Sequence, residues 1–128
     1  MISLNKLGSR NASCFDLLSC IFEIGASDFE IFTSLKVNLW QDLDMISGKV
    51  GKNRTSVFKA LQRLVSIGLA YRESRNLKAG GKYHVYCMAD SMSIKKLAEA
   101  RVTDIELSLN SLLERLDSDL TLKCGLPE

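Results

Sequence analysis

The period of the hydrophobic pattern changes at Gly68. Before it, apolar residues recur at helical spacing over residues 53–67, with Asn53 as the expected N-cap and Gly68 as the expected C-cap. After it, residues 69–77 alternate in character, KAGG predicts a turn, and the aromatic, β-branched run KYHVYCM predicts a second strand. We therefore expect a helix that leads directly into a β-hairpin over residues 69–88.

A shorter helix is expected just before that one. Leu43, Ile46 and Val50 are spaced i, i+3, i+7, which predicts a helix over about residues 41–49, and Gly51 marks the turn after it. Two helices joined by a short turn with glycine form a helix-turn-helix, whose second helix enters the major groove of DNA. The hairpin that follows has the position of the wing in a winged helix.

The pattern upstream predicts two more helices. The first has Asn11 or Ser13 as its cap, and the second has Ser27 as its cap and Asn38 at its end. Leu39 and Trp40 are too short a segment for a helix, so a brief extended link or a one-residue strand is expected there.

The C-terminal part predicts one long helix over residues 91–120. Its apolar residues alternate in spacing between four and three, which is a heptad-type seam: Ala98, Val102, Ile105, Leu109, Leu112 and Leu116. A helix of about 28 residues is roughly 42 Å long, more than a small core can cover. The seam either packs on the first helix or pairs with another chain. We favour a mixture, in which part of the first helix and the seam form a two-fold homodimer interface.

These elements predict a mainly α (α+β) protein, a winged helix-turn-helix with a β-hairpin wing and a long C-terminal dimerisation helix. The 128 residues suit a single domain over 1–128, with the winged core at 11–90 and the long helix at 91–120. No apolar run reaches the roughly 18 residues of a membrane span, and the N-terminus lacks a secretory apolar core. A cytoplasmic location without a membrane partner is expected.

Positive charge gathers in the middle of the sequence. Between Gly48 and Lys82 there are nine lysines and arginines and one acid, Glu73, a balance of +8 in a chain of net charge +2. Such a segment suits phosphates, and arginine and glutamine can also contact guanine and adenine. The expected contacts to double-stranded DNA are Lys52, Asn53, Arg54, Thr55, Ser56, Lys59, Gln62, Arg63, Arg72, Arg75, Lys78 and Lys82.

The residue types that carry catalysis or bind metals are sparse. Cys14, Cys20, Cys87 and Cys124 form no C-x-x-C pair, and His84 is the only histidine. The sequence has no phosphate-cradling glycine-rich loop before a helix and no nucleophile with candidate partners. No enzyme activity, metal site or cofactor is expected, and no small-molecule effector is evident.

The segment SGKVGKNRTSVFKALQRLVSIGLAYRESRNLKAGGKYHVY resembles the winged-helix core of small archaeal transcription regulators related to the TrmB and MarR families. The resemblance covers about residues 26–116 and is carried by K-x-R-T-S-V-x-x-x-L-x-x-L, the exit G-L-A-Y-R and the wing end G-G-K-Y-H-V-Y. It implies base and phosphate contacts at Arg54, Thr55, Ser56 and Lys59, backbone contacts at Arg75, Lys78 and Lys82, and a C-terminal helix that pairs with its mate. TrmB regulators also carry a large sugar-binding domain, which these residues do not include, so a sugar effector is not implied.

The sequence thus predicts a sequence-specific, double-stranded DNA-binding transcriptional regulator that acts as a homodimer. The recognition helix, 53–67, would enter the major groove, and the wing, 69–88, would lie on the backbone or in the minor groove. Two alternatives remain. One is a winged-helix protein–protein interaction module of a transcription or other assembly, and the other is a thiol-responsive regulator that uses Cys87 or Cys124.

Overall fold

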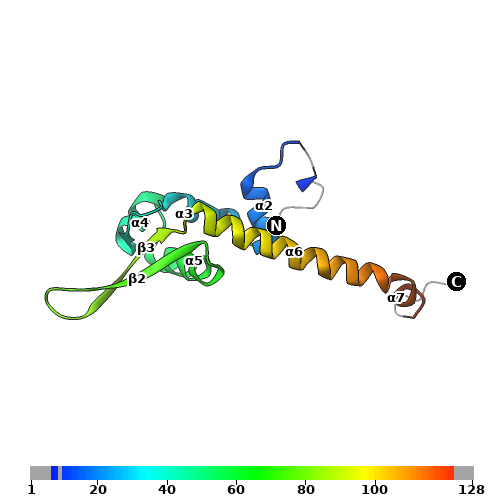
Figure 1. Ribbon diagram of the computed structural model, residues 1–128. Coiled ribbons are helices and arrows are strands. Elements are labelled where there is room, and N and C mark those ends of the chain that lie inside the picture. Colours follow the sequence, from blue (N-terminus) through cyan, green and yellow to red (C-terminus); the bar gives the residue numbers. More distant parts are fainter. Residues whose placement is uncertain (1–6, 9, 123–128) are drawn as a thin grey trace.

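The computed structural model describes residues 7–8 and 10–122. The elements are α2 (Cys14–Phe22), α3 (Ala26–Ser34), β1 (Gln41–Asp42), α4 (Leu43–Val50), α5 (Arg54–Ile67), β2 (Ala70–Asn76), β3 (Lys82–Met88), α6 (Ser91–Glu114) and α7 (Leu116–Leu122). Figure 1 shows a globular body at one end, a hairpin that projects from it, and α6 running away from it on the opposite side. The predicted mainly helical fold with a wing and a long C-terminal helix is confirmed.

The body is built around three helices and the base of a small sheet. Ile31 of α3, Ile46 of α4 and Leu61 of α5 are all fully buried and meet in one core. The sheet is antiparallel with the order β1-β3-β2, and Gln41 of β1 pairs with Tyr86 of β3. Leu39, in the link expected at residues 39–40, forms a single isolated bridge with Lys36, and β1 follows directly and adds a third strand to the sheet.

Local signals set both ends of α5. The side chain of Asn53 accepts a hydrogen bond of 2.8 Å from the backbone N–H of Ser56. At the other end Gly68 has a left-handed φ of 103°, and a Cβ there would lie 3.2 Å from a methyl group of Leu97. Both the predicted cap and the predicted stop are confirmed, so the sequence alone places α5 correctly.

The two upstream helices agree less closely. Ser13 caps α2 through a reciprocal capping box with Asp16, as one of the two predicted caps. The prediction of Ser27 as the cap of α3 is wrong, because the extended backbone of Gly25 begins that helix without a side-chain cap. The predicted end at Asn38 is also wrong. The helix stops at Ser34, and Asn38 instead occupies a left-handed turn with φ 60° that returns the chain toward β1.

Helix α6 starts from a well-anchored cap. The carboxylate of Asp90 accepts 2.7 Å and 2.9 Å hydrogen bonds from the N–H and hydroxyl of Ser93, and the pKa of Asp90 is lowered chiefly by the bond from that N–H. The hydroxyl of Tyr71, in β2, donates to the same carboxylate at 3.2 Å. One turn further in, Ile94 and Leu97 pack against the core of the body.

The far end of α6 differs from the prediction. A single helix over 91–120 is wrong, because the N–H of Arg115 turns back to the carbonyls of Leu112 and Leu113 and ends α6 at Glu114. Leu116 consequently belongs to α7 and not to α6. Although α6 has 24 residues, neither it nor any other helix in the described ranges is apolar enough to cross a membrane.

Candidate nucleic-acid interface

One side of α5 is buried and the other faces solvent. Its buried residues are Val57, Ala60, Leu61 and Leu64, each at most 1% exposed. Successive residues of a helix are rotated by about 100°, so the positions opposite this stripe are 55, 59, 62 and 66. Thr55, Lys59 and Gln62, all predicted contacts, are therefore the outermost side chains of the helix, and all are exposed.

The turn before α5 exposes the positive end of the helix. Helix α4 stops at Val50, Gly51 adopts a left-handed φ of 67°, and α5 has no acid in its first turn. The unpaired N–H groups of a helix start attract anions, and the flanking cations Lys52 and Arg54 add to that field. Lys52 lies 3.5 Å from Glu30 and Arg54 lies 2.9 Å from Asp44, both in exposed pairs that solvent screens.

Arg63 differs from the other predicted contacts. Its guanidinium binds the carboxylate of Asp28 in α3 through two hydrogen bonds, Nε to Oδ2 at 2.9 Å and Nη2 to Oδ1 at 2.6 Å. Asp28 is only 7% exposed, and its hydrogen bond raises the pKa of Arg63. Arg63 thus joins α5 to α3. The sequence analysis did not identify Asp28, although its spacing from Ile31 and Phe32 places it on the buried face of α3.

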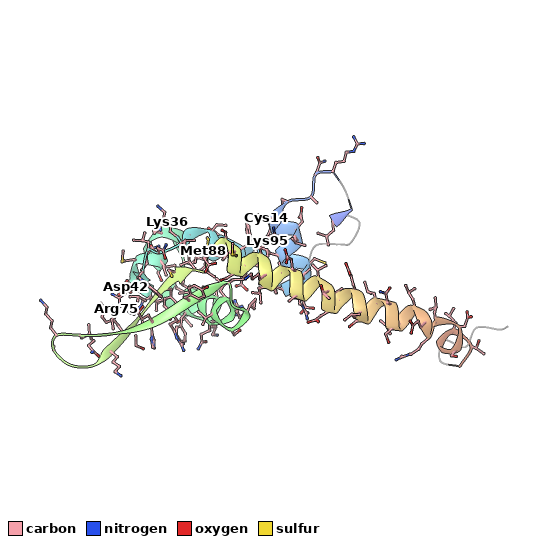
Figure 2. The ribbon with its side chains drawn as sticks, in the orientation of Figure 1. Cys14, Lys36, Asp42, Arg75, Met88 and Lys95 are labelled. Carbon is pink, nitrogen blue, oxygen red and sulfur yellow. The ribbon has the colours of Figure 1, made fainter. Side chains whose placement is uncertain are left out.

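The distal half of the wing is a two-stranded ribbon exposed on both faces. Arg75 (labelled in Figure 2) lies opposite Tyr83, one pair before the tip-side end of β2, where it pairs with Glu73 at 3.1 Å and lies 5.9 Å from the ring centre of Trp40. Lys78 and Lys82 flank the tip, whose turn requires the positive φ angles of Gly80 and Gly81. Lys78 and Lys82 are therefore exposed, while Trp40, a residue not among the predicted contacts, meets the wing through Arg75.

The folded chain redistributes the charge seen in the sequence. Three acids from outside the basic segment, Asp28, Glu30 and Asp44, pair with its cations and reduce the local balance from +8 to +5. The predicted contacts that have no ion-pair partner within the described part of the chain are Lys59, Arg72, Lys78 and Lys82. These four lie on the outer face of α5 and on the wing, which leaves that side of the body positive.

Two hollows flank α5. One, of about 610 Å³, lies between the C-terminal half of α5 and the wing strand β2 and is lined by Lys59, Gln62, Arg63, Val65, Ser66 and Arg72. The other, of about 660 Å³, lies between the start of α5 and the wing tip. The predicted contacts Lys59, Gln62 and Arg72 are thereby brought together in one hollow, and Arg54, Lys78 and Lys82 in the other.

The predicted dimer seam divides into two parts. Ala98, Val102 and Ile105 are half-buried, whereas Leu109 and Leu112 are 50% and 52% exposed. Leu116, the last predicted seam residue, is 47% exposed and lies beyond the break at the end of α6. Beyond Ile105, no other described element except α7 covers the helix (Figure 1).

The cysteines give little support to thiol chemistry. Burial raises the pKa of the Cys87 thiol, which disfavours the reactive thiolate, and no disulfide joins Cys14, Cys20 or Cys87. Cys124 lies outside the described residues. Within residues 7–8 and 10–122, no three histidine, cysteine or acidic side chains converge to hold a metal ion.

Comparisons with known proteins identify the fold. A protein of Methanosarcina mazei Go1 described as a possible transcriptional regulator superposes with a TM-score of 0.74 at 18% identity, over 84% of this chain and 93% of that one. The fold is a winged helix-turn-helix. A protein of the thermoacidophilic archaeon Sulfolobus tokodaii is also similar, with a TM-score of 0.59 at 15% identity over 73% of this chain and 92% of that one.

In sequence, the chain is 26% identical to an uncharacterized protein of Methanocaldococcus jannaschii over 107 residues, 84% of this chain and 81% of that protein. No protein-family model matches the chain. The two solved structures thus share the fold of this chain, while the sequence relative is itself uncharacterized.

Proposed function

We propose that this protein is a sequence-specific, double-stranded DNA-binding transcriptional regulator that acts as a homodimer. The observation that carries the proposal is the arrangement of Lys59, Arg72, Lys78 and Lys82, which lack ion-pair partners among the described residues and surround the exposed face of α5. A surface of this kind neutralises DNA phosphates and releases their counterions. The likeness to a possible transcriptional regulator supports the same conclusion.

In this proposal α5 enters the major groove and the wing lies on the backbone or in the adjacent minor groove. Thr55, Lys59 and Gln62 face the base edges because they are opposite the buried stripe of the helix. The N-terminal turn of α5, with Lys52, Asn53, Arg54 and Ser56, and the wing cations bind phosphates. Arg63 positions the helix through Asp28 and is removed from the set of base contacts.

The exposed face does not suit a protein–protein interaction module. Such a module would present apolar anchors on the outer face of α5. That stripe instead consists of Thr55, Lys59, Gln62 and Ser66, and all four are polar and exposed. No observation favours this alternative over DNA.

The homodimer is inferred from the uncovered leucines of α6 and α7. Leu109, Leu112, Leu113 and Leu116 are 47% to 65% exposed within eight residues, and apolar patches of this kind mark interaction sites. A second copy would cover them symmetrically. The dimer would present two recognition helices to half-sites about 34–36 Å apart, on a pseudo-palindromic duplex.

Binding to duplex DNA at two salt concentrations tests the proposal. We expect the affinity to fall steeply with salt, and the combined change Arg54→Ala with Lys59→Ala to lower it at least about tenfold by removing two phosphate or base contacts. Lys95→Ala with Lys96→Ala is the matched control, because it removes two exposed cations from α6. Absence of binding at low salt, or equal losses in the two double variants, would contradict the proposal.

Sedimentation tests the homodimer separately. Leu109→Glu places a charge in the seam and should halve the measured mass, whereas Leu107→Glu is the control. Leu107 is 64% exposed, but two residues along a helix correspond to about 200°, so it faces away from the seam. A Leu109→Glu protein of unchanged mass would show that the seam is not the interface.

A further inference from the structure

The cleft between the start of α5 and the wing tip has both cationic and apolar side chains on each of its two walls. Arg54 and Phe58 form the helix wall, and Leu77, Lys78, Lys82 and Tyr83 form the wing wall. The buried ring of Tyr86 and the start of α4 also line the cleft. Its volume is about 660 Å³. The cleft is thus a channel between the two parts of the molecule that are proposed to contact DNA.

Three apolar side chains that line this cleft are exposed to solvent. Phe58 is 36% exposed, Tyr83 is 37% exposed and Leu77 is 51% exposed. Single exposed apolar residues are ordinary, but these three come from α5 and from both sides of the wing turn and line one concave surface. An occupant with apolar faces would remove them from water.

The charges of the cleft fit an anionic occupant. Lys78 and Lys82 have no ion-pair partner within the described residues, and Arg54 is held only by an exposed pair with Asp44. The other acid of the cleft, Asp42, already accepts the N–H of Met45 as the cap of α4. Three cations therefore remain available around an apolar interior, on both walls.

Geometry selects the occupant. When a helix lies in the major groove and a wing in the adjacent minor groove, the backbone of one DNA strand passes between them. We propose that this cleft binds that sugar–phosphate backbone, with deoxyribose against Phe58, Leu77 and Tyr83 and phosphates at Arg54, Lys78 and Lys82. The inference rests on the proposed function and deepens it, because an apolar contact to the sugar disfavours a 2′-hydroxyl and selects DNA at this position.

A ribose scan tests the cleft. The probe is a 30-base-pair duplex selected by the wild-type protein from a random library, with single ribonucleotides introduced at each position in turn. We expect a 2′-hydroxyl at one or two adjacent positions of each half-site to weaken binding about tenfold, the order expected for a polar group forced against an apolar contact. A 2′-fluoro sugar at the same positions is the matched control for altered sugar pucker and should weaken binding much less.

Variants assign the effect to the cleft. Phe58→Ala should weaken binding of the all-DNA duplex about tenfold and remove most of the ribose sensitivity, whereas Phe58→Leu should preserve both. Leu77→Ala, at the exposed wing tip, tests the opposite wall without touching the core and should reduce the ribose sensitivity too. Thermal melting identifies any variant that is unfolded, and Leu77→Ala then decides the result.

The outcomes separate the two proposals. A flat ribose scan, or a position-specific effect that persists unchanged in both Phe58→Ala and Leu77→Ala, overturns the cleft assignment while leaving DNA binding intact. Failure of the wild-type protein to select or bind any duplex overturns the proposed function itself. A local ribose effect that is lost in the cleft variants supports both.

Discussion

The helices α5 and α6 are both amphipathic, but they are stabilised in different ways. Helix α5 has 14 residues, and four of them are buried in the body. Helix α6 has 24 residues and none of them is buried. The shorter helix is fixed by contacts within its own chain, and the longer one leaves the leucines of its second half exposed.

The two helices also differ in what fixes their orientation. The orientation of α5 is set by the core, by Asn53 and Gly68 at its ends, and by the bond between Arg63 and Asp28. The part of α6 beyond Ile105 has no such support from the described elements other than α7. Helices in proteins are stabilised mostly by packing and not by intrinsic propensity. The body that holds α5 is therefore stabilised by contacts within one chain.

The largest expected effect is on the free energy of unfolding, when a leucine is replaced by alanine in α5 and in α6. Leu61→Ala in α5 should lower the free energy of unfolding by about 2–5 kcal/mol, because Leu61 is 0% exposed and its loss leaves a cavity. Leu107→Ala in α6 should change it by less than about 0.5 kcal/mol, because Leu107 is 64% exposed. Urea unfolding measures both, and equal losses would show that α6 is as firmly packed as α5.

A smaller effect is expected at the anchor of α5. Asp28→Asn should lower the free energy of unfolding by about 1–2 kcal/mol, since it weakens a charged, bidentate hydrogen bond whose arginine is half-exposed and partly screened by solvent. Glu30→Gln is the control on the same helix, because both residues of the pair between Glu30 and Lys52 are open to solvent. If the two variants lose equal stability, Arg63 does not anchor the helix.

The smallest effect concerns the charge at the start of α5. Asp44→Asn should raise the affinity for DNA about two- to fivefold, because it frees Arg54 from an exposed ion pair and removes a negative charge beside the phosphates. Asp104→Asn, an exposed acid on α6, is the control and should leave the affinity unchanged. Fluorescence anisotropy with labelled duplex measures both, and weaker binding by Asp44→Asn would contradict the role of Arg54.

The sequence predicted the parts of the fold that depend on neighbouring residues. Asn53, Gly68 and the change of hydrophobic period define α5 and the wing, since caps and periodicity act within a few residues. The break at Arg115 has no such signal, because no glycine or proline marks it. The early start of α3 at Gly25 was missed for a related reason, since its cap uses backbone conformation and no side chain.

The sequence predicts the exposure of the expected DNA contacts better than it predicts which of them pair with acids of the same chain. Most predicted contacts are exposed around α5 and the wing, as the basic pattern indicated. Arg63 was assigned to DNA because its partner, Asp28, lies 35 residues earlier in the chain, beyond the reach of local patterns. Phe58 was counted among the apolar positions of α5, and only the folded wing shows that it lines an open cleft.

Asp90 lies at the junction between the wing and α6. The carboxylate of Asp90 joins the start of α6 to Tyr71 at the base of the wing, so α6 and the wing are linked at one point. An arm of 24 residues is about 36 Å long. A rotation of about 5° at that pivot moves the far end by about 3 Å, close to the rise of one base pair. In the proposed homodimer, such a rotation would change the distance between the two α5 helices by a similar amount.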